Sequence, residues 1–143
     1  MDQKSTREVQ DRIVREFNLF QDWTDKYEHI ISIGKKLAPI EPVHRVDSNK
    51  VHGCQSQVWL HAHYDGSKVH FQADSDALIV KGIIALLLRL YNDRSPGEIL
   101  ETNPDFITQI GLDKHLSQNR ANGLLAMLKQ IKRYASVFKA QNP

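Results

Sequence analysis

The feature that most constrains the fold of this 143-residue chain is a pair of alternating segments separated by a turn. Residues 58–64 place apolar side chains at every second position, and residues 68–73 do so again after an Asp65-Gly66 pair. The side chains that face one way are Val58, Leu60, Ala62, Tyr64, Val69, Phe71 and Ala73. Those that face the other way are Trp59, His61, His63, Lys68, His70 and Gln72. Asp-Gly between alternating runs predicts a β-hairpin.

The turn also predicts which residues lie opposite each other in the hairpin. If Asp65 and Gly66 form a two-residue turn, His61 lies directly opposite His70, and His63 shares their face. Zinc binding needs imidazole nitrogens that converge at about 2.0–2.1 Å from the metal, which an open strand face seldom provides. We therefore expect a solvated polar face and no metal site here.

Helical patterns flank the hairpin on both sides. Ser5 and Asp22 each stand where a side chain can accept hydrogen bonds from the first turn of an amphipathic helix, and Pro39 ends the second of these helices. Residues 74–76 are predicted to start a buried helix over residues 77–91. The starts of the later helices are predicted at Ser95-Pro96, Asn103-Pro104 and Ser117. Each start combines a capping side chain or an N-terminal proline with an apolar pattern that follows it.

Asp74 and Asp76 have two interpretations. Two neighbouring carboxylates can act in acid–base catalysis, whereas acidic side chains at a helix start bind its free N–H groups and interact favourably with its dipole. The apolar helical run that follows them favours capping.

The order of the elements indicates the fold class. Residues 50–52 are predicted to form a third short strand directly before Gly53 and Cys54. Helices before and after a small antiparallel sheet define the α+β class. The sequence therefore predicts one α+β domain over residues 1–143, in which a small three-stranded antiparallel sheet packs against N- and C-terminal helices.

The composition is that of an ordinary globular protein. It is 41% hydrophobic and 25% charged, which argues against intrinsic disorder. The longest nearly apolar run, residues 77–90, contains Lys81 and Arg89 and is shorter than the roughly 20 residues that span a bilayer. Residues 1–8 are polar and lack the apolar stretch of a signal peptide. We therefore expect no membrane partner and a cytoplasmic location.

Positive charge is concentrated near the C-terminus. Residues 111–143 contain Asp113 as their only acidic residue, and their basic residues are Lys114, Arg120, Lys129, Lys132, Arg133 and Lys139. Such a segment could contact nucleic acid, but cations also favour helix C-termini, and no aromatic or glycine-rich RNA-binding pattern accompanies these residues. Nucleic acid is therefore not an expected partner.

Cys54 is the only cysteine of the chain, so it can form no internal disulfide and cannot by itself complete a zinc or iron–sulfur site. It follows Gly53, which permits an unusual backbone conformation or the close approach of another segment. Gln55, Ser56 and Gln57 offer neutral hydrogen-bonding groups but no charge that would stabilise a thiolate. On the residues alone, an inert buried cysteine and a reactive cysteine both stay open.

The segment around Cys54 resembles the signature of a known family. Residues 51–60 read Val-His-Gly-Cys-Gln-Ser-Gln-Val-Trp-Leu and are similar to the sequence around the acceptor cysteine of the SufE sulfur-acceptor family, which includes the CsdE proteins. Further family-like features recur in order over roughly residues 10–135. They are Trp23, Lys26-Tyr27, Ile31 through Gly34, Asp74-Ser75-Asp76, Ile79-Val80-Lys81-Gly82, Leu116-Ser117 through Arg120, and Gly123-Leu124.

The resemblance implies a SufE/IscU-like fold and a role in iron–sulfur metabolism. A protein of this family accepts sulfur from a cysteine desulfurase of the SufS/CsdA type, stimulates that enzyme, and passes the sulfur to a SufBCD-type scaffold complex. Cys54 aligns with the acceptor cysteine, which carries the sulfur as a persulfide. The residues of the surrounding loop are His52, Gly53, Gln55, Ser56 and Gln57. No cofactor is implied for this chain, since pyridoxal phosphate belongs to the desulfurase.

Arg120 matches the family's arginine at the start of the last helix. The resemblance implies that its cation lies near the sulfur site, where it would favour a thiolate or persulfide anion. The family often has a Pro-Ser pair before this arginine, where this chain has Gln118-Asn119. The change leaves the predicted helix start intact and loosens the expected orientation of Arg120.

Two other functions are compatible with the residues. A hydrolase or transferase could use Cys54 as its nucleophile and His52 or a hairpin histidine as its base, although no orienting acid or substrate-binding motif accompanies them. A non-catalytic module could instead stimulate a desulfurase allosterically without using its cysteine.

Overall fold

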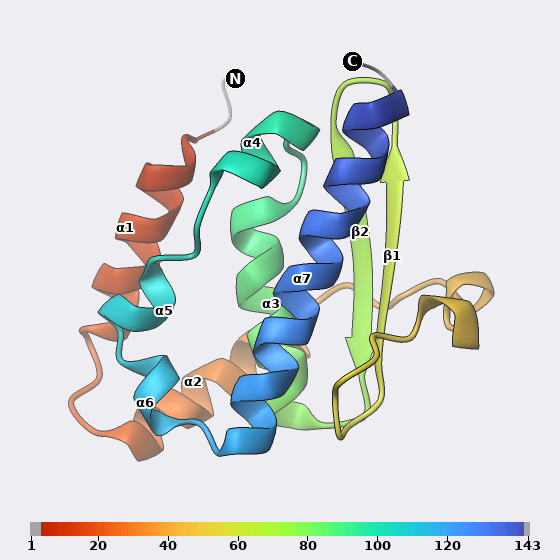
Figure 1. The fold of residues 1–143 in the computed structure, drawn as a ribbon. Helices are drawn as coiled ribbons and strands as arrows, with labels where there is room; N and C mark the ends of the chain where they lie inside the picture. The colour runs from red at the N-terminus through yellow and green to blue at the C-terminus, as the bar shows by residue number, and fades with distance from the viewer. Residues whose placement is uncertain (1–3, 142–143) are drawn as a thin grey trace.

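A buried central helix and a β-hairpin organise the chain, of which this computed structural model describes residues 4–141 (Figure 1). The two ends of the domain expected over residues 1–143 lie outside the described residues. The helices are α1 (Thr6–Phe17), α2 (Trp23–Lys35), α3 (Leu78–Tyr91), α4 (Pro96–Glu101), α5 (Phe106–Gln109), α6 (Leu112–His115) and α7 (Gln118–Gln141). The strands are β1 (Val58–Tyr64) and β2 (Val69–Ser75), preceded by two short 3₁₀ helices, η1 (Pro42–His44) and η2 (Asp47–Asn49).

The α+β class follows from this arrangement, but the sheet is smaller than expected. Within residues 4–141 it contains only β1 and β2, which run antiparallel. The third strand predicted at residues 50–52 is wrong: Lys50 makes an isolated bridge with Trp59, and the Val51 N–H donates to the Val58 carbonyl at 2.8 Å. Pairing stops there because Gly53, with φ of +95°, turns the chain away from β1.

Local capping explains several helix starts. The Ser5 hydroxyl accepts a hydrogen bond from the Glu8 N–H at the start of α1, and the Asp22 carboxylate accepts one from the Asp25 N–H at the start of α2. Ser95 begins α4 with the reciprocal bonds of a capping box. These bonds satisfy N–H groups that a helix leaves without intrahelical partners.

The expected capping of α3 by Asp74 and Asp76 is wrong. β2 extends through Ser75, and Ala77 occupies the N-cap position without a side-chain bond. The Asp74 carboxylate instead pairs with Arg45 and, at 3.3 Å, with Lys81. The helix begins too late in the sequence for these side chains to cap its first turn. The Asp74 carboxylate joins β2 to the preceding loop and to α3, and the Asp76 carboxylate accepts from the Gln57 N–H.

Helix α3 forms the centre of the core. It is buried along most of its length and packs against α1, α2, α7 and β2. α2 crosses it at Gly34 and Gly82, where a Cβ atom added to Gly82 would lie only 2.1 Å from the Ile30 carbonyl oxygen. The two glycines therefore allow the helix backbones to approach more closely than any side chain would permit.

The hairpin presents two different faces. One face packs Val58, Leu60 and other apolar side chains into the core, as the alternation predicts. Residues 41–50 cover part of the other face, where the Arg45 guanidinium lies 4.2 Å from the centre of the Trp59 ring. Figure 1 shows α7 running beside the hairpin and in front of α3, so this helix borders both the sheet and the loop that precedes β1.

The hairpin register differs from the prediction. Tyr64 pairs with Val69 and His63 with His70, whereas we expected His61 opposite His70. The turn is centred one residue later than expected because the Asp65 carboxylate accepts the N–H groups of Ser67 and Lys68 at 2.8 and 2.7 Å. The shift preserves the face on which each side chain lies, since it moves the pairing by two residues.

No helix within residues 4–141 combines the length and the apolar character needed to cross a bilayer.

Candidate functional site

The loop that carries Cys54 is anchored at both ends. On one side, buried Val51 is joined to β1 by its hydrogen bond to Val58. On the other side, the Gln57 N–H donates to the Asp76 carboxylate at 3.0 Å, and the Gln57 carbonyl accepts from the Ser75 hydroxyl at 2.9 Å. Residues 52–56 therefore span two fixed points.

The centre of this loop rests on α7 at two glycines. Gly53, in the left-handed conformation that the sequence suggested, lies so close to α7 that an added Cβ would be 3.3 Å from the Cβ of Ala126. The Cys54 thiol donates to the Gly123 carbonyl at 3.6 Å, a long and weak sulfur hydrogen bond. Among residues 4–141, it is the only hydrogen bond that joins residues 52–56 to another element. The loop is thus held to α7 mainly by packing.

A pocket of about 380 Å³ opens beside the Cys54 sulfur. It is lined by Cys54, Gln55, Ser56, Val80, Ile83, Ser117, Asn119, Arg120, Gly123 and Met127. The apolar side chains come from α3 and α7, and the polar ones from the loop and the start of α7. The sulfur therefore lies where an apolar wall meets a polar rim.

Burial raises the pKa of the Cys54 thiol above its ordinary value. No charged neighbour contributes to this shift. The free protein consequently keeps Cys54 protonated at neutral pH, whereas cysteines that react rapidly in the resting state have lowered pKa values.

Arg120 is exposed and lines the pocket of Cys54. Its backbone N–H donates to the Ser117 hydroxyl at 3.3 Å, so Ser117 caps α7 as predicted. The same bond holds the backbone of Arg120 in place at the start of the helix. The structure thus brings Arg120 and Cys54 to one pocket, and the described residues show no hydrogen bond between their side chains.

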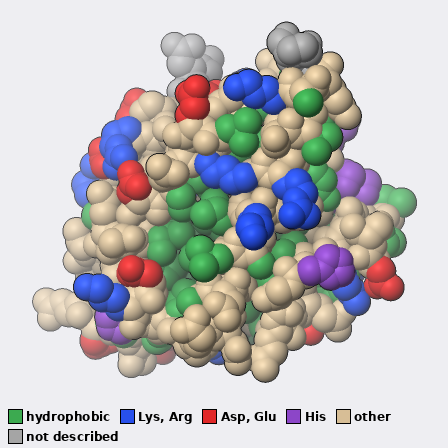
Figure 2. All heavy atoms as spheres, viewed as in Figure 1, with side chains coloured by type: hydrophobic (Ala, Val, Ile, Leu, Met, Phe, Trp, Pro, Cys, Tyr) green, Lys and Arg blue, Asp and Glu red, His purple; other side chains and the backbone are tan. Residues whose placement is uncertain are grey.

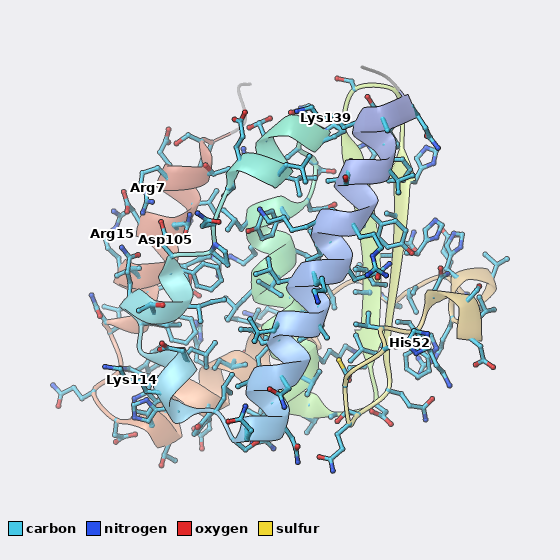
Figure 3. All side chains as sticks on the ribbon, in the orientation of Figure 1. Arg7, Arg15, His52, Asp105, Lys114 and Lys139 are labelled. Carbon is cyan, nitrogen blue, oxygen red and sulfur yellow. The ribbon has the colours of Figure 1, made fainter. Side chains whose placement is uncertain are left out.

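The other predicted loop residues divide between two surfaces. Gln55 and Ser56 line the pocket, and Gln57 anchors the loop through its backbone. His52 is exposed and lines a different groove on the other side of the loop, together with Gly53 (Figure 3). The structure therefore separates His52 from the pocket that contains the sulfur.

The hairpin histidines form pairs rather than one cluster. His61 stacks on His44 with ring centres 3.5 Å apart, and the ring centres of His63 and His70 are 6.3 Å apart. His70 also binds the carboxylates of Asp65 and Asp93, at 2.8 and 2.5 Å, which raise its pKa. No group of three metal-ligating side chains converges within residues 4–141.

Sequence reasoning missed the apolar side of the pocket. Gly123 lies directly beside the sulfur: a Cβ atom added to it would be 3.5 Å from Sγ. Val80, Ile83 and Met127 form the rest of the apolar wall. The available signal was Gly123 itself, since glycine inside a long helix usually marks a close approach. The three apolar residues carry no such signal, because helical periodicity marks them only as core.

These observations define a small α+β protein with one shielded thiol on an anchored loop. A sequence profile described as "SufE: Fe-S metabolism associated domain" matches residues 11–135, so the chain belongs to the SufE family, which is associated with iron–sulfur metabolism.

Known relatives are consistent with this membership. An uncharacterized SufE-like protein of Rhizobium meliloti (strain 1021) is 39% identical over 127 residues, covering 85% of this chain and 91% of the relative. "SufE-like protein 1, chloroplastic/mitochondrial" of Arabidopsis thaliana is 42% identical over 124 residues, covering 86% of this chain and 33% of that longer protein.

The fold also matches a solved structure. The solution structure of a hypothetical protein from Thermus thermophilus superimposes with a TM-score of 0.75 at 24% identity, covering 92% of this chain and 96% of the other. At this identity the match concerns the fold alone.

Proposed function

We propose that this protein is a sulfur carrier. It accepts the outer sulfur of a persulfide on a cysteine desulfurase of the SufS/CsdA type, holds it on Cys54, and passes it to an iron–sulfur scaffold of the SufBCD type. Membership of the SufE family supports the pathway. The observation that carries the proposal is the position of the only cysteine of the chain, shielded beside a pocket on a loop that is fixed at its ends and weakly held at its centre.

The proposed step is a thiol exchange at sulfur. The Cys54 thiol first loses its proton to a base in the docked complex, and the thiolate attacks the outer sulfur of the donor persulfide. A new S–S bond forms on Cys54, the donor's S–S bond breaks, and the donor cysteine leaves as a thiolate that takes up a proton. An acceptor thiolate later attacks the outer sulfur on Cys54 in the same way, so no external oxidant or reductant is needed.

The pocket suits this cargo. Its volume of about 380 Å³ leaves room for a second sulfur beside Cys54. The apolar side formed by Val80, Ile83 and Met127 would limit access by reductants in solution, while Arg120 on the rim offers a cation to a persulfide anion. The lack of a second cysteine also protects the cargo, since a neighbouring thiol would attack the persulfide and release sulfide.

Stimulation of the desulfurase follows from the same chemistry. Removing the sulfur restores the free cysteine of that enzyme for its next turnover, and the pyridoxal phosphate stays with the desulfurase. We place the reaction in the cytoplasm, where a single thiol remains reduced.

A hydrolase or transferase with Cys54 as its nucleophile receives less support. Its nearest sequence candidate for a base, His52, lines a separate groove, and burial raises the pKa of Cys54 rather than lowering it. Such enzymes need a base within hydrogen-bonding distance of the nucleophile.

The test is mass spectrometry of the protein after incubation with a cysteine desulfurase and free cysteine. We expect the Cys54 peptide to gain the mass of one sulfur atom, and we expect the gain to disappear after treatment with a reductant. The matched control is Cys54→Ser, which should neither gain sulfur nor stimulate the desulfurase. Full stimulation by Cys54→Ser would instead support an allosteric module, and the absence of added sulfur on the wild type would refute the carrier.

A further inference from the structure

A second hollow of about 440 Å³ lies on the opposite side of the Cys54 loop from the sulfur pocket. It is lined by Val51, His52, Gly53, Asn122, Leu125, Ala126, Lys129, Gln130 and Arg133. We call it the α7 groove, because one wall is the 51–53 segment and the other is the exposed side of α7. At 1.5 Å per residue, the stretch from Asn122 to Arg133 is about 17 Å long, enough to contact a short helix or strand.

The α7 groove is basic and has no acidic lining residue. Lys129 and Arg133 are exposed, are four residues apart on α7, and therefore lie on the same side of the helix. Neither forms an ion pair with any of residues 4–141. Figure 2 shows Lys and Arg side chains gathered over the middle of α7, with the Asp and Glu side chains of this face nearer its edges. The positive charge here is uncompensated by the protein itself.

An apolar side chain accompanies the charges. Leu125 lies one turn before Lys129 in the lining and is 61% exposed. The groove thus offers two cations beside an exposed apolar contact, which matches a protein segment with acidic residues and an apolar side chain better than it matches a bare anion.

A second basic hollow in the structure contains an acidic lining residue, Glu16, and lies away from the Cys54 loop. It is lined by Arg12, Lys36 and Arg89 among others, but Arg89 pairs with the Glu16 carboxylate at 2.9 Å. It also includes no residue of the Cys54 loop. Of these two hollows, only the α7 groove combines uncompensated positive charge with proximity to the Cys54 loop.

The wall formed by residues 51–53 connects the α7 groove to the sulfur. Gly53 rests against Ala126, and both of these residues line the groove, while Cys54 directly follows Gly53 and faces the pocket on the other side. A segment that fills the groove must contact His52 and Gly53 and compete with their packing on α7. Because only one weak hydrogen bond holds the loop to α7, this competition can release the sulfur from its shielded position.

We propose that the α7 groove receives an acidic segment of the sulfur-donating desulfurase and that its binding lifts the Cys54 loop from α7. The inference rests on the proposed function and adds to it the docking residues and the trigger for exposing the sulfur. Charge steers the encounter, and the occupied groove then converts docking into access to Cys54.

The test is a double charge reversal, Lys129→Glu with Arg133→Glu. Its matched control is Lys114→Glu with Lys139→Glu, which changes the net charge equally at two exposed lysines outside the groove, on α6 and near the far end of α7 (Figure 3). The rate of association with the desulfurase is measured by stopped-flow mixing at low and high salt, and sulfur loading of Cys54 by mass spectrometry. We expect the groove variant to lose about tenfold to 100-fold in association rate at low salt, and the control to lose far less.

Loading by a low-molecular-weight polysulfide separates docking from chemistry. It requires no docking, so the groove variant should load as the wild type does. If the desulfurase fails to load the wild type, the function and the docking site are both refuted. If the wild type loads and the groove variant binds equally well, or the control weakens to the same extent, the docking site alone is refuted. A single-stranded RNA oligonucleotide is added as a competitor. If it binds more strongly than the desulfurase and displaces it, the α7 groove is a nucleic-acid site and the docking proposal is refuted.

Discussion

Cys54 is half-buried, and this burial raises the pKa of its thiol. The ordinary thiol already has only a few per cent of thiolate at neutral pH, so the free protein has still less. Arg120 shares the pocket but contributes nothing to this shift. In the free protein, Cys54 is therefore protected both by packing and by its proton. Under the proposed function, Arg120 acts only in the docked or persulfidated state.

The first prediction concerns the pH dependence of alkylation. A raised pKa keeps the thiol protonated below that pKa, so the rate of Cys54 alkylation by iodoacetamide should still be rising where an unfolded cysteine, with its pKa of about 8.5, has levelled off. The Arg120→Ala variant should give the same midpoint while transferring sulfur more slowly. The rates are followed by mass spectrometry, with the wild type in urea as the unfolded reference. A folded midpoint at or below that of the unfolded protein would contradict this account.

The second prediction concerns Gly123. An added Cβ would lie 3.5 Å from the Cys54 sulfur, an ordinary contact that the unmodified thiol tolerates. Gly123→Ala should therefore raise the free energy of unfolding by about 0.5–1 kcal/mol, because alanine favours the helix. The methyl group occupies space beside the sulfur, so the persulfide should lose its sulfur to dithiothreitol faster than in the wild type. Urea unfolding and timed mass spectrometry measure the two effects, and an unchanged release rate would place the cargo elsewhere in the pocket.

Among the contacts between elements, the crossing of α2 and α3 leaves the least space, because it needs glycine at Gly34 and Gly82. The third prediction is that Gly82→Ala lowers the free energy of unfolding by about 3 kcal/mol or more, since its Cβ would lie 2.1 Å from the backbone oxygen of Ile30 and neither helix can move away cheaply. Gly97→Ala in α4 is the control, because an added Cβ there meets nothing within 4 Å. Urea denaturation measures both. Equal stabilities of the two variants would show that α2 shifts freely on α3.

The elements also show what the sequence could predict. Local signals sufficed for the helix starts at Ser5, Asp22 and Ser95, because a cap is decided within one turn. The hairpin was predicted from its alternation, but its register was wrong because the Asp65 carboxylate binds the turn N–H groups and moves the turn. The pairing of Asp74 with Arg45, 29 residues away, could not be predicted, since only the folded chain brings them together.

For the site, the limit of prediction is similar. Cys54 and Gly53 stand out because each residue type has an unusual property in its local sequence. The Gly123 carbonyl that binds the sulfur is 69 positions further along the chain, and nothing in its local pattern refers to Cys54. The groove charges at Lys129 and Arg133 also look, in sequence, like cations that any helix C-terminus favours. Their place in a groove becomes visible only in the folded chain, where the 51–53 segment forms the other wall.

At the scale of the molecule, α7 connects the three features on which the proposed sulfur transfer depends. It shields the sulfur at Gly123, contributes Arg120 to the pocket, and carries the basic side of the α7 groove. The proposal requires only residues 52–56 to move, since α3 and the hairpin are packed together in the hydrophobic core. Under the proposed function, the cargo is hidden or presented according to the position of one short loop, while the rest of the fold stays unchanged.

The last prediction tests whether docking requires the loop to open. In Gly123→Cys, the new Cβ would lie 4.0 Å from the Cys54 Cβ, within the range of about 3.5–4.5 Å for disulfides, so the two cysteines should join under oxidising conditions and lock the loop on α7. Binding is measured by titration with a desulfurase whose persulfide-forming cysteine has been replaced, so that thiol exchange cannot reopen the lock.

If docking selects the open loop, the locked protein should bind about tenfold more weakly or worse, because its binding-competent fraction is removed, and dithiothreitol should restore the affinity. Cys54→Ser combined with Gly123→Cys provides the control, since it contains the same side chain at position 123 but can form no internal disulfide. Its affinity should not respond to dithiothreitol. Equal affinities of the locked and reduced forms would mean that the partner binds the closed protein and that the loop opens only afterwards, independently of the α7 groove.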